Sequence, residues 1–242
     1  MPTVFLLRHG LTELTGPVLA GRTPGVHLDE RGRRQAAAAA DRLAMLPLVA
    51  VVTSPLERCA ETARAVLSQQ RAAGRQPARH TDRRLLECDY GDWTGREIKS
   101  LVKDPLWRVV QAHPSAVTFP NGESMPDMAA RAVRAIRDRN DRLATEHGDH
   151  AVWVACSHGD VIKAILADAL GMHLDLFQRI VVDPCSISAI RYAAGRPFVL
   201  FSNSVTGDLA PYLPVPPKPG RRRRAAAAAD ATVGGGAGGG TV

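Results

Sequence analysis

The feature that most constrains the fold is a short, unbroken apolar segment followed at once by a polar turn, and it occurs twice. Residues 3–7 run into Arg-His-Gly at 8–10, and residues 151–156 run into Ser-His-Gly at 157–159. Apolar segments without alternation are typical of strands covered on both faces, as in a parallel sheet with helices on each side. We therefore predict an α/β fold, a three-layer α/β/α sandwich with a mostly parallel central sheet.

The remaining segments alternate between helix and strand patterns. We expect Ser or Asp to cap three of the helices, because their side-chain oxygens accept hydrogen bonds from the free N–H groups at a helix start. The predicted helices are Asp29 to Leu43, Pro55 to Gln70 with a capping box of Ser54 and Glu57, Ser124 to His147 with a capping box of Ser124 and Asp127, and a helix after Gly159 that stops at Gly171. The other predicted strands are 49–53, a short one around His80, and a closing hairpin of 186–192 and 198–202.

The composition changes near residue 214. Residues 1–213 are long enough for one folded domain, whereas residues 214–242 consist largely of Pro, Arg, Ala and Gly and are expected to be disordered. The full chain has 31 basic and 24 acidic residues, a net charge of +7, but residues 1–213 have 26 and 23. The positive charge belongs mostly to the Arg221–Arg224 tail, so nucleic-acid binding by the folded part is not expected.

The spacing of the cysteines and the length of the apolar segments bear on the cellular location of the protein. Cys59, Cys88, Cys156 and Cys185 are widely spaced, which argues against zinc and against the disulfide framework of a secreted protein. The first apolar segment reaches Arg8 too soon for a signal peptide, and no apolar run is long enough to cross a membrane. We expect a cytoplasmic protein without membrane contact; its oligomeric state, a homo-oligomer included, stays open.

Two further positions join the histidine turns at one edge of the predicted sheet. Ligands of open α/β sheets bind beyond the carboxyl ends of the strands, where His9 and His158 are expected. Arg58 follows the strand at 49–53, and Glu87 lies in an acidic, aromatic and glycine-rich loop. Arginine binds phosphate oxygens bidentately, histidine can attack phosphorus to form a covalent intermediate, and a carboxylic acid can protonate the departing oxygen. This set predicts phosphoryl transfer.

With these residues assembled, the chain resembles the histidine phosphatase superfamily, in its phosphoglycerate-mutase-like branch. The resemblance covers about residues 4–202, nearly the whole expected domain. Its motifs, in the family's order, are Arg8-His9-Gly10 with Thr12, Gly21-Arg22, the helix start at 29–32, the second-arginine motif at 54–63, Glu87 with Tyr90-Gly91, Gly122-Glu123-Ser124, and Ser157-His158-Gly159. Each motif alone is short, whereas their common order is specific.

The resemblance implies that residues 1–213 form a catalytic domain and gives roles to five side chains. His9 is expected to be the nucleophile that becomes phosphohistidine. Arg8, Arg58 and His158 are expected to hold the phosphoryl oxygens and the charge that builds on them. Glu87 is expected to protonate the leaving group and later to activate water or the acceptor hydroxyl. Such a site is expected to need no metal and no cofactor.

The acid role brings an expectation about protonation. An ordinary glutamate titrates near 4.3, so an acid that donates near neutral pH needs a raised pKa. We expect enclosure or a neighbouring acid to raise the pKa of Glu87, and Asp89 is one candidate neighbour.

Substrate contacts are implied for Thr15, Gly21, Arg22 and Gly159. Two positions depart from the family's pattern, because Leu11 stands where a polar residue is common and Thr15 where asparagine is usual. Both lie outside the catalytic set, so they bear on the choice of phosphomonoester rather than on the reaction.

The resemblance favours a phosphatase that hydrolyses small-molecule phosphomonoesters, because the 71 positions from Glu87 to His158 leave a compact middle segment similar to that of the family's broad-specificity phosphatases. The same motifs leave open a phosphomutase and a catalytically silent phosphate-binding protein. A metallohydrolase with His9, His158, Asp160 and Glu87 as ligands is a further alternative, although no helical ligand pair such as H-E-x-x-H occurs. The apolar residues of the middle segment are expected either to cover the site or to pack in the core: Trp107, Val109, Val110 and Phe119.

Overall fold

The computed structural model describes residues 2–193 and 196–213, so the predicted disordered tail at 214–242 lies outside the described residues. Its strands are β1 (Thr3–Arg8), β2 (Leu48–Thr53), β3 (Ala78–Thr81), β4 (Val152–Ser157), β5 (Ile187–Ala193) and β6 (Arg196–Ser204). They form one sheet in the order β3-β2-β4-β1-β5-β6. The first four strands in that order pair in parallel, whereas β5 and β6 are antiparallel to their neighbours. The predicted α/β class, with a mostly parallel sheet, is confirmed.

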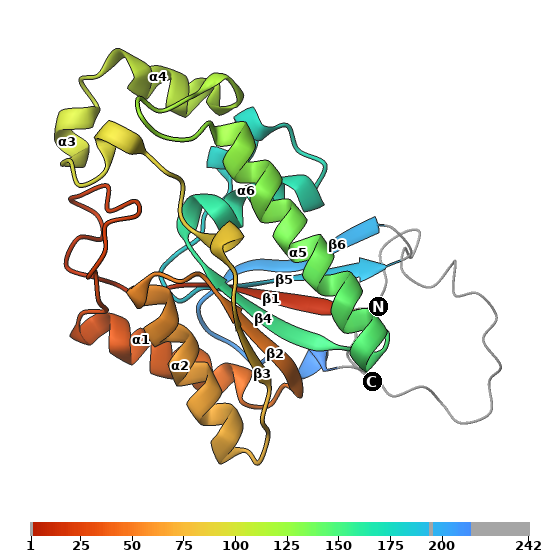
Figure 1. The fold of residues 1–242 in the computed structure, drawn as a ribbon. Coiled ribbons are helices and arrows are strands. Elements are labelled where there is room, and N and C mark those ends of the chain that lie inside the picture. The colour runs from red at the N-terminus through yellow and green to blue at the C-terminus, as the bar shows by residue number, and fades with distance from the viewer. Residues whose placement is uncertain (1, 194–195, 214–242) are drawn as a thin grey trace.

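Helices cover both faces of this sheet (Figure 1). Helices α1 (Glu30–Leu43) and α2 (Glu57–Ala72) pack together on one face, and α5 (Met125–His147) and α6 (Gly159–Ala169) pack together on the other. Two short helices, α3 (Ile98–Leu101) and α4 (Pro105–Ala112), belong to the connection before α5. The 3-10 helices are Arg83–Leu85, Gly91–Trp93, Pro114–Ala116, Leu174–Arg179 and Ala210–Tyr212.

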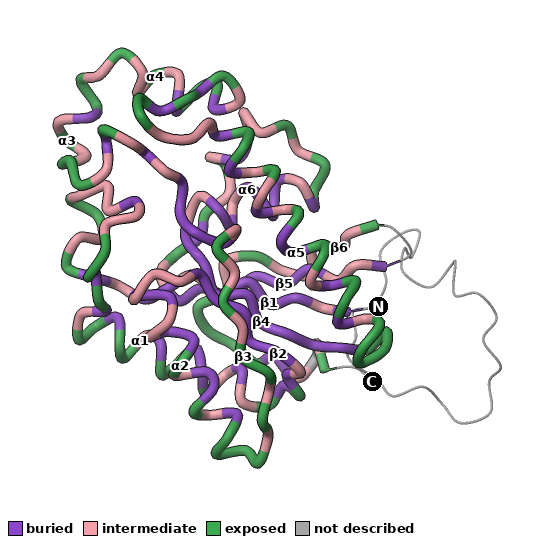
Figure 2. Tube along the Cα trace, in the orientation of Figure 1, coloured by how far each residue is buried: buried purple, intermediate pink, exposed green. Residues whose placement is uncertain are grey.

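Strand β1 shows why its sequence has no polar alternation. Val4 and Leu6 pack in the core beneath α5 and α6, and Phe5 and Leu7 pack in the core beneath α1 and α2. All four side chains are at most 1% exposed, and the central strands are buried along most of their length (Figure 2). Because both faces of the sheet are covered, each successive side chain of the strand meets an apolar layer.

Two of the three predicted caps are confirmed. Asp29 accepts a hydrogen bond from the Gly32 N–H at 2.6 Å, and Ser124 accepts one from the Asp127 N–H at 3.0 Å. The predicted end of α5 at His147 is also observed.

The capping box predicted for Ser54 and Glu57 is wrong. Helix α2 begins at Glu57, after Leu56, and has no side-chain cap. The Ser54 hydroxyl contacts the Leu56 N–H at 3.4 Å, and it also lies 2.8 Å from Nε2 of His158. The serine therefore serves the strand-end site more than the helix.

The apolar middle segment packs in the core. Trp107 stacks on Trp93 with 6.1 Å between ring centroids, and Phe119 meets Trp93 edge-on at 5.4 Å. Val110 and Phe119 are buried in the core beneath α5 and α6, and Val109 packs against it. Of the two expectations for this segment, core packing is the one observed.

Within the described part of the chain, no helix is both long and apolar enough to cross a membrane. The four cysteines are free thiols, and each is buried. The antiparallel pair β5 and β6 confirms the predicted hairpin, whose connecting residues 194–195 lie outside the described part.

The turn after β1 lies against the first turn of α1, and two glycines permit the close approach. A Cβ built on Gly10 would lie 2.6 Å from the Gly32 carbonyl oxygen. A Cβ built on Gly32 would overlap the Leu11 carbonyl oxygen and lie 2.8 Å from the Leu11 nitrogen. These neighbours are backbone atoms, so relief would require the strand-end turn and the helix to move apart.

Replacing Gly32 by Ala is therefore expected to lower the free energy of unfolding by about 3 kcal/mol or more, the upper part of the range for overpacking. Urea denaturation measures this loss, with Arg31→Ala as a control on the exposed side of the same turn. Equal stability of the two variants would contradict the close approach.

Candidate active site

A pocket of about 360 Å³ opens beyond the carboxyl ends of β1 and β4. This is the sheet edge at which a ligand was expected. Most of the predicted site residues line it, namely Arg8, His9, Thr15, Gly21, Arg58, Glu87 and Gly159. His158 is fully buried against this group, and its ring centroid lies 5.2 Å from that of His9. Arg22 is the one predicted site residue that lies apart from the pocket lining and from the two histidines.

The hydrogen bonds of His9 fix which ring nitrogen carries the proton. Nδ1 lies 2.8 Å from the Gly10 carbonyl oxygen, which can only accept, so Nδ1 is the donor. Nε2 accepts a hydrogen bond from Nε of Arg58 at 3.2 Å, so it carries the lone pair. Burial, followed by the charges of Arg58 and Arg8, holds the pKa of His9 well below its usual value. The ring is therefore neutral near pH 7, and its unprotonated Nε2 has the lone pair that a nucleophile requires.

Arg58 ties the site together from the first turn of α2. Its side chain is among the largest that are fully buried, and its Nη2 donates to the Gly21 carbonyl at 2.6 Å and to Nδ1 of His158 at 3.2 Å. With the Nε contact to His9, one guanidinium spans both histidines. A cation at a helix N-terminus opposes the helix dipole, which is a reason to expect an anion beside it.

Two arginine nitrogens at the site are buried without a protein partner. They are Nε of Arg8 and Nη1 of Arg58. Arg8 is itself held in place, since its Nη1 donates to the Val182 carbonyl at 2.6 Å. Buried donors normally have partners, and unsatisfied donors on guanidinium groups suit the oxygens of a bound phosphate.

His158 is oriented by a residue that sequence reasoning placed elsewhere. Its Nδ1 accepts from Arg58, so its Nε2 carries the proton and donates to Ser54 Oγ at 2.8 Å. Burial and the charge of Arg58 hold the pKa of His158 well below its usual value. The sequence signal for Ser54 was present, because it ends a strand beside the site, but it also fitted a helix cap.

Glu87 has the raised pKa that a general acid near neutral pH requires. It is 9% exposed, and one carboxylate oxygen accepts from the Cys88 N–H at 3.0 Å. Burial, followed by the negative charge of Asp160, raises the pKa of Glu87 to about 7. Arg58 and Arg8 act in the opposite direction but do not cancel these two effects.

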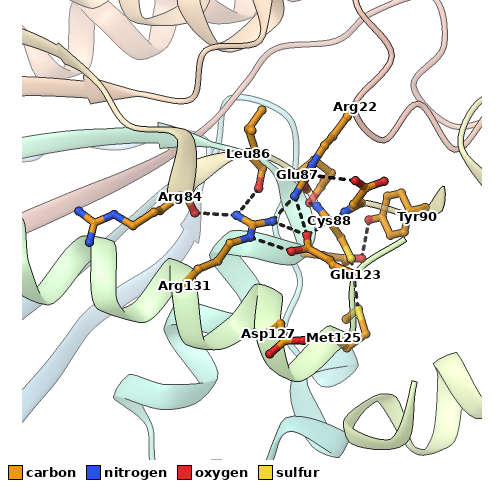
Figure 3. A network of polar contacts seen from close by, with 12 residues as sticks. Arg22, Arg84, Leu86, Glu87, Cys88, Tyr90, Glu123, Met125, Asp127 and Arg131 are labelled. Atoms are coloured by element: carbon orange, nitrogen blue, oxygen red, sulfur yellow. Dashed lines mark hydrogen bonds and ion pairs between the residues drawn. The ribbon is translucent and has the colours of Figure 1, made fainter. Parts of the chain in front are cut away.

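The acid that acts on Glu87 is therefore Asp160 and not the candidate Asp89. Asp89 forms an ion pair with Arg22 at 3.0 Å, and it is Asp160 whose charge acts on Glu87. Arg22 also donates to the Glu87 carbonyl oxygen at 2.9 Å and to Glu123 at 2.8 Å (Figure 3). The three nitrogens of the Arg22 guanidinium thus donate to the Glu87 carbonyl, to Asp89 and to Glu123.

Sequence reasoning gave no site role to Tyr90 and Lys163, which line the pocket with Asp160. The Tyr90 hydroxyl donates to Asp160 at 2.7 Å, and the Lys163 ammonium donates to Gln178 at 3.0 Å. Asp160 directly follows the second His-Gly pair, so its place in the sequence was a usable signal. Lys163 lies on α6 without a motif of its own.

The described residues include no cluster of three or more His, Cys, Asp or Glu side chains arranged to hold a metal ion. The geometry of the proposed metal ligands His9 and His158 is explained instead by their contacts with Arg58 and with each other.

The family model of the histidine phosphatase superfamily, branch 1, matches residues 4–205. The chain belongs to this superfamily. A bifunctional protein of Mycobacterium tuberculosis is 34% identical over 195 residues, which are 79% of this chain and 50% of that protein. The chain therefore spans half the length of that relative. A Proteus mirabilis protein named "Probable phosphoglycerate mutase GpmB" is 31% identical over 198 residues, 79% of this chain and 86% of that protein.

Solved structures of the superfamily have the same fold. Bacillus stearothermophilus YhfR matches with a TM-score of 0.75 and 26% identity, over 85% of this chain and 98% of that one. A mycobacterial glucosyl-3-phosphoglycerate phosphatase matches with a TM-score of 0.70 and 25% identity, over 84% and 98%. The names of these relatives include a mutase and a phosphatase, so the superfamily is one of phosphoryl-transfer enzymes.

The raised pKa of Glu87 has a consequence for stability. Below the pKa of the unfolded chain the carboxyl is protonated in both states. As the pH rises towards 7, only the unfolded chain gives up the proton, so the folded state loses stability until its own pKa is passed. Glu87→Gln removes this loss.

Between pH 5 and pH 8.5, the free energy of unfolding of Glu87→Gln, relative to the parent chain, is expected to rise by about 2 to 3 kcal/mol. Urea denaturation at the two pH values measures it, with the exposed Glu13→Gln as control. A difference that does not change with pH would mean that Glu87 titrates normally.

Proposed function

We propose that this protein is a phosphatase that hydrolyses small-molecule phosphomonoesters through a phosphohistidine at His9, without a metal or cofactor. The observation that supports the proposal is the combination of a neutral His9 whose Nε2 is unprotonated and two unpartnered buried guanidinium nitrogens beside it. His9 supplies the nucleophile, and the two guanidinium nitrogens supply hydrogen-bond donors for the phosphate that it attacks. Thr15, Gly21 and Gly159 complete the proposed substrate contacts, since they line the same pocket.

In the first step, Nε2 of His9 attacks phosphorus. The N–P bond forms as the bond from phosphorus to the leaving oxygen breaks, and the Glu87 carboxyl transfers its proton to that oxygen. Nε of Arg58 exchanges its hydrogen bond to Nε2 for one to a phosphoryl oxygen. Arg8 and Arg58, through donors held in advance by the protein, stabilise the charge on the equatorial oxygens. His158 acts through Arg58, because its Nδ1 accepts from that guanidinium and its Nε2 proton is donated to Ser54.

In the second step, water replaces the leaving alcohol. Glu87, now a carboxylate, takes a proton from the water as its oxygen attacks phosphorus, and the N–P bond breaks. Inorganic phosphate leaves, His9 is again neutral and Glu87 is again protonated. The same side chain serves as acid and then as base, which the raised pKa near neutral pH permits.

The outer part of the pocket favours a phosphatase over a phosphomutase. A mutase must hold its dephosphorylated ligand until phosphate returns, and a phosphoglycerate ligand also carries a carboxylate. Among the described lining residues, Lys163 is the one cation besides the two arginines, and it already donates to Gln178. The other walls are largely apolar, with Val18, Leu19, Ile180, Val181 and Val182.

The mutase named among the relatives keeps phosphoglycerate mutase as the second candidate. Release of free phosphate, against appearance of an isomerised phosphate ester, separates the two on a panel of phosphomonoesters. The cytoplasmic location stays a prediction.

His9→Ala is expected to abolish turnover of p-nitrophenyl phosphate, with a fall on the order of 10³-fold or more, because removing a covalent nucleophile leaves only binding and electrostatics. The parent chain, quenched in base during turnover, is expected to yield an acid-labile phosphoryl group on the peptide that contains His9. His150→Ala, exposed and at the opposite end of β4, is the control. Turnover that survives in His9→Ala would contradict the proposed nucleophile.

For an alkyl phosphate such as n-butyl phosphate, whose leaving group requires a proton, kcat/KM is expected to have an alkaline limb near pH 7, because the free enzyme loses the Glu87 proton there. Asp160→Asn removes a charge that raises the pKa of Glu87, so the limb is expected to move to lower pH. Asp141→Asn, exposed on α5, is expected to leave the limb in place. An unmoved limb in Asp160→Asn would show that another group sets it.

A further inference from the structure

Glu87 lies in an irregular segment whose carbonyl groups are held by a side chain from another element. Residues 86–90 belong to no helix or strand, so the segment cannot satisfy its own backbone groups through a ladder. Arg131, on α5, donates to the carbonyl oxygens of Arg84 at 2.6 Å, Leu86 at 2.8 Å and Glu87 at 3.1 Å (Figure 3). One guanidinium therefore fixes three carbonyls around the proposed acid.

Glu123 fixes that guanidinium in turn. Its two carboxylate oxygens accept from Nη2 of Arg131 at 2.5 Å and from Nε of Arg131 at 3.0 Å, a bidentate pair. The oxygen that contacts Nη2 also accepts from the Asp89 N–H at 2.8 Å and from Arg22 at 2.8 Å. Arg22 then returns to the Glu87 carbonyl at 2.9 Å. The loop is thus held before Glu87, at the carbonyls of Arg84 and Leu86, and after it, at the Asp89 N–H.

The side chains of this network contact the loop that carries Glu87 and do not line the pocket. Neither Arg22, Glu123 nor Arg131 is among the residues that line the pocket. The side chains of Arg131 and Glu123 are 19% and 17% exposed, so water competes little for their hydrogen bonds. Removing one member of the Arg131–Glu123 pair would be destabilising, because the remaining charged side chain would stay largely buried without its partner.

We propose that Arg131, Glu123 and Arg22 are positioning residues for the proton donor, holding the backbone of residues 84–89 so that the Glu87 carboxyl meets the leaving-group oxygen. The inference rests on the acid role of Glu87 under the proposed function. It assigns Arg22, expected from the sequence to contact substrate, to the support of the acid. A displacement of catalytic groups by about 1 Å can cost about 10²-fold in rate, so loosening this loop is expected to affect proton donation first.

The test compares two leaving groups, because only one of them needs the acid. Nitrophenolate leaves readily without a proton, whereas the alkoxide of an alkyl phosphate requires one. The second-order constant kcat/KM reports the steps up to phosphohistidine formation and is measured for p-nitrophenyl phosphate and for n-butyl phosphate. The ratio of the two constants does not depend on the fraction of folded enzyme, so it separates positioning from a loss of folded protein.

Arg131→Lys, which keeps the charge and loses the fork, is expected to lower kcat/KM for n-butyl phosphate by about 10-fold or more. The value for p-nitrophenyl phosphate is expected to fall by less than about 3-fold, because its departure depends little on the acid. Glu123→Gln is expected to change the ratio in the same direction. Arg134→Lys, one turn along α5 and exposed, is the matched control and is expected to leave the ratio unchanged.

Glu87→Gln sets the largest change in ratio that loss of the acid can produce. A parent chain that turns over neither ester would refute the proposed function itself. A selective fall in Glu87→Gln, with an equal fall or no fall for both esters in Arg131→Lys and Glu123→Gln, would overturn the positioning role alone. If Arg131→Lys does not fold, Glu123→Gln carries the test.

Discussion

The parallel pairing of β1 with β4 is the constraint on which the candidate site depends. In its register Arg8 lies opposite Ser157, and the His9 N–H donates to the Ser157 carbonyl at 3.0 Å. Two histidines that are 149 positions apart in the sequence thereby leave neighbouring strands side by side. The apolar layers on both faces of the sheet fix this register, because a one-residue slip would exchange the side chains that meet each layer.

The same burial that fixes the strands sets the protonation of the site. Enclosure disfavours charge, so it lowers the pKa of both histidines and raises the pKa of Glu87. Under the proposed function, a neutral nucleophile and a protonated acid then coexist near pH 7, between two arginines that would bind the charge of the substrate. Fully buried Arg58 is costly in itself, and its contacts with both histidines and with the Gly21 carbonyl offset part of that cost.

Much of this could be predicted from the sequence, because the residues that carry chemistry follow directly on strong local patterns. His9 and His158 end apolar strands, and the confirmed caps at Asp29 and Ser124 each depend on residues three positions apart. The local pattern gave a wrong prediction at Ser54, because its hydroxyl accepts a hydrogen bond from His158, which is distant in the sequence, and does not cap the helix. Local patterns also failed to assign the charged partners around Glu87. Asp89 and Asp160 are both near family motifs, and only packing shows which one an arginine neutralises.

Arg131 illustrates the limit most clearly. It lies on a helix with several other arginines, and nothing in its local sequence distinguishes it from the exposed Arg134. The role proposed for it depends on a loop more than 40 positions earlier in the chain, where its guanidinium donates to three carbonyl oxygens. A local sequence motif can identify the proposed proton donor. The residues proposed to position it can be found only from the packing of elements that are distant in the sequence.

The most direct test of the central claim is a crystal structure of the protein with vanadate, which adopts the five-coordinate geometry of a phosphoryl group in transfer. The account predicts a vanadium atom bonded to Nε2 of His9, with oxygens that accept from Nε of Arg8 and Nη1 of Arg58 and an apical oxygen within hydrogen-bond distance of Glu87. Vanadate bound away from His9, or bound without those two arginine nitrogens, would contradict it.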